Sequence, residues 1–531
     1  MKLTGLLFAA ALLGSCTQPA AEENYTRHVD PKIGTGGHGH VFVGANVPFG
    51  LVQVGPTSIP QTWDWCSGYH ASDSTVIGFS HTHLSGTGIG DLFDVTVMPV
   101  TGEVTYARGE EADPASGLWS YADRTQEIAR PGYYSVPLTR YGIRAELTAT
   151  ARVGLHRYTF PASEKAAVVF DLENGGCWDK ATETHLAKEG DRTVTGWRHS
   201  TGWAKDQRVY FVAEFSKPFE KFETIGDNYA RASFRTTDGE QVSLKVALSP
   251  VSVEGARENL AAELPGWDFE ETAKAADKAW NAELSKVKIE TADETARRIF
   301  YTALYHTMIA PSLFCDVNGD YYGSDHAIHR NADFTNYTTF SLWDTYRAAM
   351  PLMTVLHPEK MADIVQTMLH IADEQGRLPV WHLWGNETDC MVGNPGIVAV
   401  ADAIVKGIGG FDREKAFEAI RKTAMNPDRG NGLRMEYGYI PCEMFNEAVA
   451  YDMEYALADG AAARAAETLG KAEDAKYFEE RSHSYRNYFD PATRFMRGRD
   501  SRKGWRTPFN AFASTHRADD YCEGNAWQYT W

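Results

Sequence analysis

The hydrophobic pattern of the chain changes its period near residue 254, and this change predicts two domains of different architecture. Between Val41 and Val253, short runs of β-branched and aromatic residues alternate with Gly, Asn and Asp turns. The segment from Tyr133 to Phe160 predicts successive antiparallel strands. Many short strands separated by regular turns are typical of a β-sandwich. We therefore predict an antiparallel β-sandwich domain over residues 29–255.

Helical spacing dominates the second half of the chain. A stretch rich in Ala, Glu and Lys predicts a helical linker over residues 256–292. Apolar residues then recur on single helical faces (Met361, Ile364, Val365, Met368 and Ile371, and later Phe417, Ile420 and Ala424). The predicted helices arrive in pairs with short loops, as in an (α/α)6 toroid, which needs about a dozen helices. The sequence predicts fewer, so we expect a truncated barrel over residues 293–531.

The N-terminus has the features of a bacterial export signal. Lys2 precedes an apolar run from Leu6 to Leu13, which is too short to span a membrane and ends in Leu-Gly-Ser-Cys. This ending resembles a lipobox, in which Cys16 would be acylated. We predict a lipoprotein signal peptide over residues 1–16 and a polar tether over residues 17–28. The expected location is the periplasm or the cell surface, with membrane contact only through the lipid anchor.

Charge and composition narrow the class of partner. The formal net charge is −19 and no basic stripe is present, which argues against nucleic acid and anionic membranes as partners. The 14 Trp and 25 Tyr residues suit carbohydrate, although large proteins also bury aromatic residues. Cysteines after Cys16 have no C-x-x-C spacing, so both free thiols and disulfides stay open. We expect a monomer.

The last eleven residues, Tyr521 to Trp531, hold the strongest candidate chemistry. Glu523 stands beside a Gly-Asn step and is followed by aromatic residues and the amides of Asn525 and Gln528. Hydrolysis of a glycosidic bond needs a carboxylic acid near the leaving oxygen, flat apolar faces and groups that bind hydroxyls. The alternative interpretation is a helix start in which Glu523 is solvated in the first turn.

Two further segments combine polar and aromatic residues. Asp344 and Arg347 lie three residues apart at the start of a predicted helix and either form a surface ion pair or face the cavity of the toroid. Apolar neighbours favour the second interpretation, in which Asp344 holds sugar hydroxyls. The segment from Trp381 to Pro395, which includes Glu387, predicts a loop that lines the active site of the toroid or a structured connector.

Three other motifs do not carry the chemistry that they suggest at first. The glycine-rich segment Gly34–Gly39 neither follows a strand nor opens a helix, which excludes a dinucleotide site. His81 and His83 lack matching downstream ligands, which favours structural or substrate-contacting histidines over a metal site. The segment from Asp316 to Asp320 lacks the later residues of an EF-hand and predicts a tight turn.

Together these motifs make the chain similar to glycoside hydrolase family 92, exported bacterial α-mannosidases, from about Val29 to Trp531. The resemblance depends on the segments Gly34–Gly37, Trp63–Tyr69, Gly78–Gly88, Trp343–Arg347 and Glu523–Tyr529. It implies a β-sandwich packed on an (α/α)6 barrel, with an active site at the junction. It also implies calcium-dependent, inverting, exo-acting hydrolysis of α-mannosides such as those of N-glycans.

The resemblance also implies roles for individual residues. Glu523 matches the general acid of the family, and Asp344 matches a carboxylate that holds the mannose. Trp65 and Trp381 correspond to sugar-contacting residues. Apart from the resemblance, we also expect Arg347 and Glu387 to bind substrate.

The general base and the main Ca²⁺ ligands of the family follow the Glu-Gly-Asn motif, and this chain ends at Trp531. We therefore expect those ligands beyond the chain and assign no metal ligand within it. Asn386-Glu387-Thr388 echoes a calcium motif but precedes Glu523, so Ca²⁺ binding is not transferred to it. We expect the chain to be a fragment without its general base.

Two alternatives remain open from the sequence. The first is another enzyme with a β-sandwich and an (α/α)6 barrel, such as a glycoside phosphorylase, which would need a phosphate pocket beside the acid. The second is a surface lipoprotein that binds glycans without turnover. In each case the expected ligand is a glycan, with mannose-containing substrates favoured by the resemblance.

Overall fold

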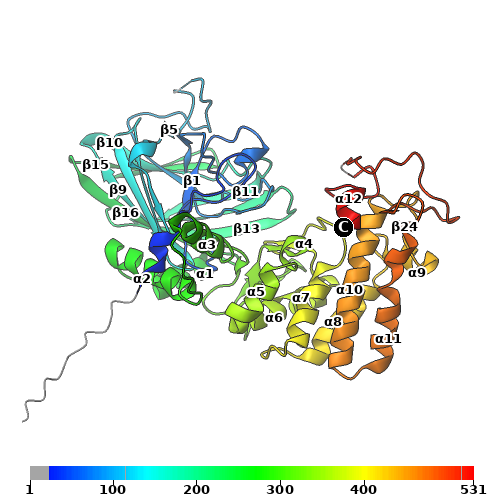
Figure 1. Ribbon diagram of the computed structural model, residues 1–531. Coiled ribbons are helices and arrows are strands. Elements are labelled where there is room, and N and C mark those ends of the chain that lie inside the picture. The colour runs from blue at the N-terminus through cyan, green and yellow to red at the C-terminus, as the bar shows by residue number, and fades with distance from the viewer. Residues whose placement is uncertain (1–22, 114, 516) are drawn as a thin grey trace, which may run out of the picture.

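The computed structural model describes residues 23–113, 115–515 and 517–531 and contains two lobes. Figure 1 shows the strands of the first half gathered in one lobe and helices α5 to α11 in the other. The sequence prediction of an antiparallel β-sandwich followed by an α-helical domain is confirmed. The predicted signal peptide and Cys16 lie outside the described residues.

Two antiparallel sheets form the sandwich. The six-stranded sheet has the order β1 (Gly55–Thr57), β3 (Gly78–Ser80), β4 (Thr96–Thr101), β10 (Ser163–Asp171), β15 (Tyr229–Thr236), β14 (Lys221–Ile225). The eight-stranded sheet has the order β11 (Lys180–Glu189), β12 (Thr193–Thr201), β13 (Gln207–Phe215), β16 (Glu240–Ser249), β9 (Val153–Phe160), β8 (Ile143–Ala149), β7 (Tyr133–Leu138), β6 (Ile128–Arg130). Smaller elements of this lobe are the pair β2 (Thr75–Val76) and β5 (Ser120–Tyr121), and the 3₁₀ turns η1 (Tyr25–His28), η2 (Trp63–Trp65) and η3 (Arg124–Gln126).

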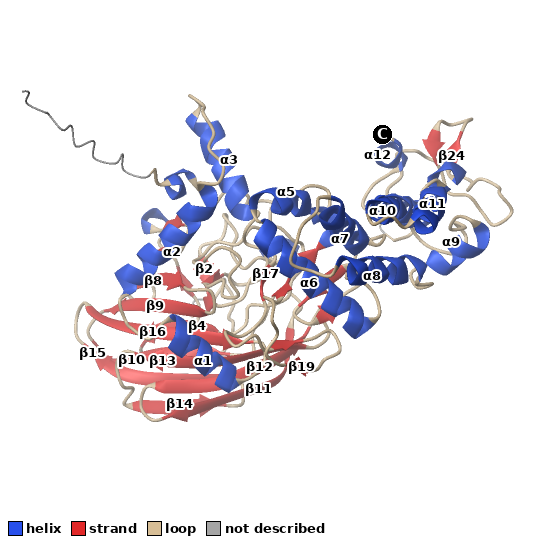
Figure 2. Cartoon of the chain, turned by 90° about the horizontal axis from the view of Figure 1, so that it is seen from below, coloured by secondary structure: helices blue, strands red, loops and turns tan. Residues whose placement is uncertain are grey.

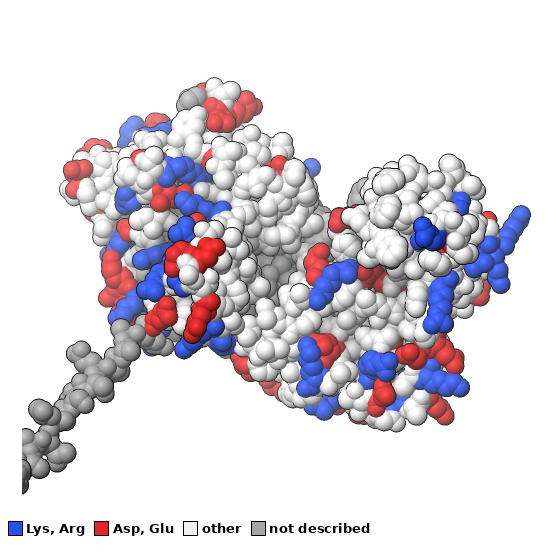
Figure 3. Space-filling view, in the orientation of Figure 1, with Lys and Arg blue, Asp and Glu red and all other residues white. Residues whose placement is uncertain are grey.

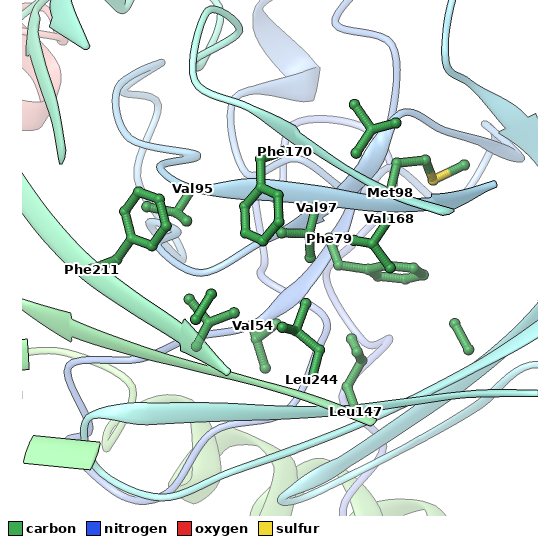
Figure 4. Packing of buried hydrophobic residues seen from close by; sticks show 14 of the residues in the cluster. Val54, Phe79, Val95, Val97, Met98, Leu147, Val168, Phe170, Phe211 and Leu244 are labelled. Carbon is green, nitrogen blue, oxygen red and sulfur yellow. The ribbon is translucent and has the colours of Figure 1, made fainter. Parts of the chain in front are cut away.

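The inner faces of the two sheets form one apolar core. Val97, Val168 and Phe170 of the six-stranded sheet point toward Phe211 and Leu244 of the eight-stranded sheet, and all five side chains are fully buried (Figure 4). Successive strand residues point to opposite faces, and β4 and β10 are buried on both, which explains why they appear in the sequence as short continuous apolar runs. Burial of this core is the main stabilisation of the sandwich.

The outer face of the eight-stranded sheet is covered as well. Helix α1 (Val253–Glu263) lies across β16 and β13, as Figure 2 shows, and α2 (Phe269–Leu284) follows it. Leu260 of α1 packs with Val153, Val212 and Ala247 of the sheet. The segment predicted as a helical linker is therefore helical and completes the packing of the sandwich.

The second domain is mostly helical. Its helices are α3 (Glu294–His306), α4 (Leu342–Thr345), α5 (Ala349–Leu356), α6 (Pro358–Gln375), α7 (Pro395–Val405), α8 (Arg413–Met425), α9 (Asn431–Tyr437), α10 (Ala448–Thr468), α11 (Ala472–Arg481) and α12 (Ala526–Thr530), with the 3₁₀ turn η4 (Ser484–Asn487). Short strand pairs lie between them: β17 (Ser312–Leu313) with β20 (Tyr337–Thr338), β18 (Tyr321–Tyr322) with β19 (Ile328–His329), and β24 (Phe489–Asp490) with β25 (Phe495–Met496).

Helix packing follows the apolar faces read from the sequence. The predicted apolar positions of α6 and α8 are all buried, and α10 packs between α7 and α11. Local signals define the ends, since Asp412 caps the first amides of α8 and Gly376, with φ +88°, ends α6. Several of the described helices are only one or two turns long, so the assignment of this domain as a truncated (α/α)6 toroid stays a prediction. None of the described helices is both long and apolar enough to cross a membrane.

Three local predictions were wrong in detail. The segment from Trp381 is not a plain loop, because β22 (Trp381–Leu383) pairs with β21 (Phe340–Ser341) and β23 (Asn386–Glu387). The sequence pattern also predicts helices over Glu443–Leu469 and Ala472–Phe489, but α10 begins only at Ala448 and α11 already ends at Arg481. Two-residue strands carry too few positions to show a period.

The remaining motifs are structural. His81 lies beyond the end of β3, with its Nε2 2.9 Å from His156 Nε2, and the Nδ1 of His83 is 2.7 Å from the Gln53 carbonyl oxygen. Burial lowers the pKa of His81 to about 3 and that of His83 to about 4, so both rings are neutral. The Asp316–Asp320 segment is a turn in which the Asn318 side chain accepts from the Asp320 amide. The six cysteines among the described residues are free thiols.

The two domains share apolar packing. Trp381, Leu383 and Trp384 of the helical domain belong to the same buried cluster as the sandwich core. In return, Phe42 and Phe49 of the first domain pack into the core of the helical domain. The junction is therefore a continuous interior.

Glu283 at the end of α2 ties the helical linker to the second domain. Its carboxylate lies 2.7 Å from Lys286 Nζ and 3.1 Å from Nδ1 of His357, which precedes α6. Burial raises the pKa of Glu283, but the hydrogen bonds from His357 and Lys286 outweigh this effect and lower it to about 2. The stabilisation is therefore present above the unfolded pKa of about 4.3 and is lost as the pH falls through about 2.

We expect Glu283→Gln to lower the free energy of unfolding by about 1–3 kcal/mol at pH 7. The difference from wild type should shrink as the pH falls from 4 toward 2. Urea unfolding at several pH values measures it. Glu271→Gln, on the same helix in an exposed pair with Lys274, should cost less than about 0.5 kcal/mol. An equal loss in both variants, or a pH-independent difference, would contradict the assignment.

Candidate active site

A cleft of about 720 Å³ lies where the two domains meet. Figure 3 shows the surface hollowed between the two lobes, with charges of both signs distributed over each. The sandwich contributes Trp203 and Lys205, from the turn between β12 and β13. Loops of the helical domain and the start of α10 contribute the remaining walls (Thr388, Asp389, Cys390, Met391, Glu443, Met444, Phe445, Asn446, Glu447, Tyr451, Arg517 and Cys522). Such a junction between domains is a common place for ligand sites.

The Glu523 loop is fixed against the start of α10. The Ala450 amide donates to the Asp520 carbonyl at 3.1 Å, and the Tyr529 hydroxyl donates to the Cys522 carbonyl at 2.7 Å. Cys522 is buried and lines the cleft, and the next residue, Glu523, is exposed with a left-handed φ of +47°. A non-glycine residue in this backbone region is uncommon and marks a position held by its surroundings. The loop thus presents Glu523 to solvent directly beside the cleft.

Glu523 and Asp344 lie around one wall residue. Burial raises the pKa of the Cys390 thiol, and the negative charges of Glu523 and Asp344 raise it further, while Arg517 lowers it. Cys390 and Arg517 both line the cleft. The two carboxylates that the sequence singled out therefore both act on the same wall residue, although 179 positions separate them in the chain.

Asp344 and Arg347 do not pair with each other. Asp344, in the one-turn helix α4, accepts a hydrogen bond from the Ser341 hydroxyl at 2.5 Å. Arg347 instead binds Glu454 of α10 at 2.7 Å, and the Tyr346 hydroxyl donates to the same carboxylate at 2.8 Å. The simple i,i+3 ion pair weighed in the sequence analysis is therefore wrong, and Arg347 joins α4 to α10.

Glu387 and Trp381 stabilise the wall of the cleft. The Glu387 carboxylate accepts the amides of Val380 at 2.8 Å and of Trp381 and Asp389 at 2.9 Å each. Trp381 is 3% exposed and packs edge-on against Trp203, with ring centroids 4.7 Å apart. These contacts hold the small sheet and place Trp203 in the wall of the cleft.

Trp65, Asn525 and Gln528 are also engaged in local contacts. Trp65 lies in η2 of the sandwich, stacks on His70 with centroids 4.3 Å apart, and donates from Nε1 to Asp73 at 2.7 Å. Asn525 caps the amides of Trp527 and Gln528, and the Gln528 side chain accepts from the Asn525 amide at 2.9 Å. This reciprocal capping box starts α12. Their predicted contacts with substrate stay predictions.

Several residues of the site were missed in the sequence. Trp203 and Lys205 stand in a turn between strands, and a turn carries no apolar period that would single them out. Glu454 was missed because its partners Arg347 and Tyr346 are more than 100 positions away, at separations of 107 and 108. A Trp and a Lys two positions apart in a Gly-containing turn were the available signal for the first pair.

The described cleft residues do not fit a calcium site. Ca²⁺ takes about six to eight oxygen ligands. Asp389 is paired with Arg377 and lies 3.5 Å from Arg429, and Glu443 accepts from the Ser501 amide at 2.9 Å. In the part of the chain that the structure describes, these groups do not form a cluster of three ligands. No step of the chemistry is therefore derived through a metal ion.

A cluster of metal-ligating side chains occurs elsewhere. Asp325, His329 and Glu374 place one ligand atom each within 4.8 Å of the others, and none of them lines the cleft. The two oxygens of Glu374 already accept from the Tyr321 hydroxyl at 2.9 Å and the Ser324 amide at 2.7 Å. These hydrogen bonds explain the arrangement as a connection between the β18–β19 hairpin and α6.

The fold and the site define a class of protein. A β-sandwich joined to a helical domain, with tryptophans at their junction and an exposed glutamate beside the cleft, is the arrangement of a carbohydrate-active enzyme. The sequence pattern of the glycosyl hydrolase family 92 N-terminal domain matches residues 28–249, and that of the glycosyl hydrolase family 92 catalytic domain matches residues 255–531. The chain belongs to glycoside hydrolase family 92.

Solved structures of the family have the same fold. The α-mannosidase BT3965 of Bacteroides thetaiotaomicron, solved with mannoimidazole, is 39% identical, with a TM-score of 0.93 over 96% of this chain and 70% of that one. The inverting mannosidase BT2199 of the same organism is 29% identical, with a TM-score of 0.86 over 96% of this chain and 71% of that one.

A curated relative is also similar. An uncharacterized secreted glycosidase of Arthroderma benhamiae is 26% identical over 93% of this chain and 66% of its own length. The chain thus spans about two thirds of the length of this relative.

Proposed function

We propose that the protein takes part in the hydrolysis of terminal α-mannosides of N-glycans or mannans, acting from the chain end with inversion of the anomeric carbon. The observation that carries the proposal is the 39% identity over 96% of the chain to an α-mannosidase whose structure holds mannoimidazole. Similarity to an inverting mannosidase supports the stereochemistry. Similarity to a secreted glycosidase is consistent with export, and we propose anchoring through Cys16.

Glu523 is the proposed general acid. Its exposed position on a fixed loop beside the cleft suits a group that protonates the leaving oxygen. Asp344, whose charge also acts on Cys390, is proposed to hold mannose hydroxyls, since an ionised carboxylate accepts two of them. Trp203 offers an apolar wall for the C–H face of a sugar.

Inversion requires a second carboxylate that activates water, about 6.5–9.5 Å from the acid. We assign this role to no described residue. Calcium dependence is likewise proposed from the resemblance to the family alone, and the cleft residues discussed above supply no ligand set for it.

The proposal is tested by following α-mannobiose with ¹H NMR in the presence of the protein. Inversion predicts that β-mannose appears first and then mutarotates. Early accumulation of α-mannose would exclude inversion. Absence of mannose release, with retained binding of mannosides, would instead support the alternative of a glycan-binding protein without turnover. Phosphate-dependent release of mannose 1-phosphate would indicate a phosphorylase.

A further inference from the structure

A second cavity of about 880 Å³ lies on the sandwich domain, at the free edge of the eight-stranded sheet. It is bounded by the start of β11, by the loop between β10 and β11, and by the turn between β14 and β15. The residues that matter for its chemistry are Arg108, Asn174, Trp178, Thr182, Glu183 and Asn228. None of the roles assigned above uses this cavity.

Trp178 presents a fixed aromatic surface there. The residue is 39% exposed, and its backbone amide donates to the Gly90 carbonyl at 3.2 Å. The backbone of Gly90 packs closely against the Trp178 indole. A Cβ added to Gly90 would lie only 3.0 Å from this ring and 2.8 Å from Cys177 Cβ. An exposed tryptophan that is held rigidly offers a flat apolar face at low entropic cost to a ligand.

The polar rim suits hydroxyl groups. Arg108 donates from Nη2 to the Gly175 carbonyl at 3.0 Å, and its Nε is buried without a protein partner. Asn228 and Glu183 add an amide and a carboxylate, and the register of β11 shifts around Thr182, which projects an extra residue at the edge. One aromatic face among amide, carboxylate and guanidinium groups matches the alternation of C–H and O–H surface on a sugar.

Asp91 connects this cavity to the cleft. Its carboxylate accepts the amides of Trp203 at 2.9 Å and Ala204 at 2.8 Å, which fixes the turn that lines the cleft. Burial raises the pKa of Asp91 to about 6, and hydrogen bonds from these two amides and from the side chain of Trp178 act against that rise. One buried carboxylate therefore holds the tryptophan of each cavity.

We propose that the cavity around Trp178 is a second carbohydrate-binding site, which holds a part of a mannose-containing glycan remote from the bond that is cut. The nature of the glycan rests on the proposed function, whereas binding itself does not require hydrolysis. Because the Gly90–Asp91 segment is hydrogen-bonded to the backbones of both Trp178 and Trp203, the two sites are neighbours, and one branched or long glycan can reach both.

Retention in native gels that contain α-mannan tests the proposal, with the whole chain carrying Glu523→Gln so that the polysaccharide is not consumed. Trp178→Ala in this background should weaken retention about tenfold, as expected for one lost aromatic platform. Thr182→Arg, which adds a long side chain at an exposed position, should weaken retention similarly by filling the cavity. Trp267→Ala, at a tryptophan that lines neither cavity and packs on Lys245, is the matched control and should not change retention.

The outcomes separate this proposal from the proposed function. Unchanged retention in both Trp178→Ala and Thr182→Arg, whether or not wild type releases mannose, would overturn the second site. Weakened retention with Trp178→Ala alone would also overturn it, since a filled cavity must block the ligand. Weakened retention in both variants, with no mannose released by wild type, supports the site and contradicts only the hydrolase.

Discussion

In the protein that also carries its general base, Glu523→Gln is expected to lower kcat for α-mannobiose by about 10²–10⁴-fold, because a proposed general acid is replaced by an amide that cannot protonate the leaving oxygen. The side chain is exposed and its loop is fixed by backbone contacts of Ala450 and Cys522, so the fold should be unaffected. Thermal unfolding of the variant should therefore match wild type.

The leaving group makes this test specific. Dinitrophenolate leaves a dinitrophenyl α-mannoside without being protonated. Glu523→Gln should therefore lose far less activity on this substrate than on α-mannobiose. Glu467→Gln, an exposed carboxylate on α10 paired with Arg464, is the control and should retain both activities. Equal losses on both substrates would remove Glu523 from the role of acid and leave it as a binding group.

The second large effect is expected in the sandwich, where Arg198→Met should lower the free energy of unfolding by about 3–5 kcal/mol. Arg198 is fully buried and binds Asp94 at 2.7 Å and Asp179 at 2.5 Å, and both carboxylates are also buried. Burial alone would lower the pKa of Arg198, but Asp179 and Asp94 raise it, so the guanidinium is charged. Removing it leaves two negative charges in the interior without a counter-ion.

Urea unfolding measures this loss, and two comparisons identify its cause. Arg235→Met, in the exposed pair with Glu220, should cost at most about 1 kcal/mol. Adding Asp94→Asn and Asp179→Asn to Arg198→Met should restore part of the stability, because the uncompensated charges are removed as well. If the triple variant is less stable than Arg198→Met, lost packing and not lost charge is responsible.

The sequence predicts regular elements well where a face of the element is buried. The alternation between Tyr133 and Phe160 placed three strands, and the spacing from Met361 to Ile371 placed α6, because burial on one side imposes a period. Contacts between residues far apart in the chain produce no such period in the sequence. The contact of Arg347 with Glu454 and the pairing of β21 with β22 arise only when the chain folds.

The candidate site was predictable in part. The carboxylates Glu523 and Asp344 stand in recognisable segments and prove to be neighbours of Cys390. Asn525 and Gln528 show the opposite case, since Asn-x-x-Gln at a helix start is itself a signature of a capping box, which the interpretation as hydroxyl-binding amides passed over. The position of Trp203 in the wall of the cleft could not be predicted from the sequence. A residue in a turn is positioned by contacts with residues far away in the chain, here by the hydrogen bond from its amide to Asp91.

The continuous interior at the domain junction bears on how such a chain can be recombined. Trp381, Leu383 and Trp384 complete a core built mostly by the sandwich, while Phe42 and Phe49 complete that of the helices. A chimaera that joined this sandwich to the helices of another family member would have to match side-chain volumes on both sides of residue 250 at once. The two segments are therefore expected to be inherited as a pair, and functional exchange should succeed more readily at the surface turns that line the two cavities.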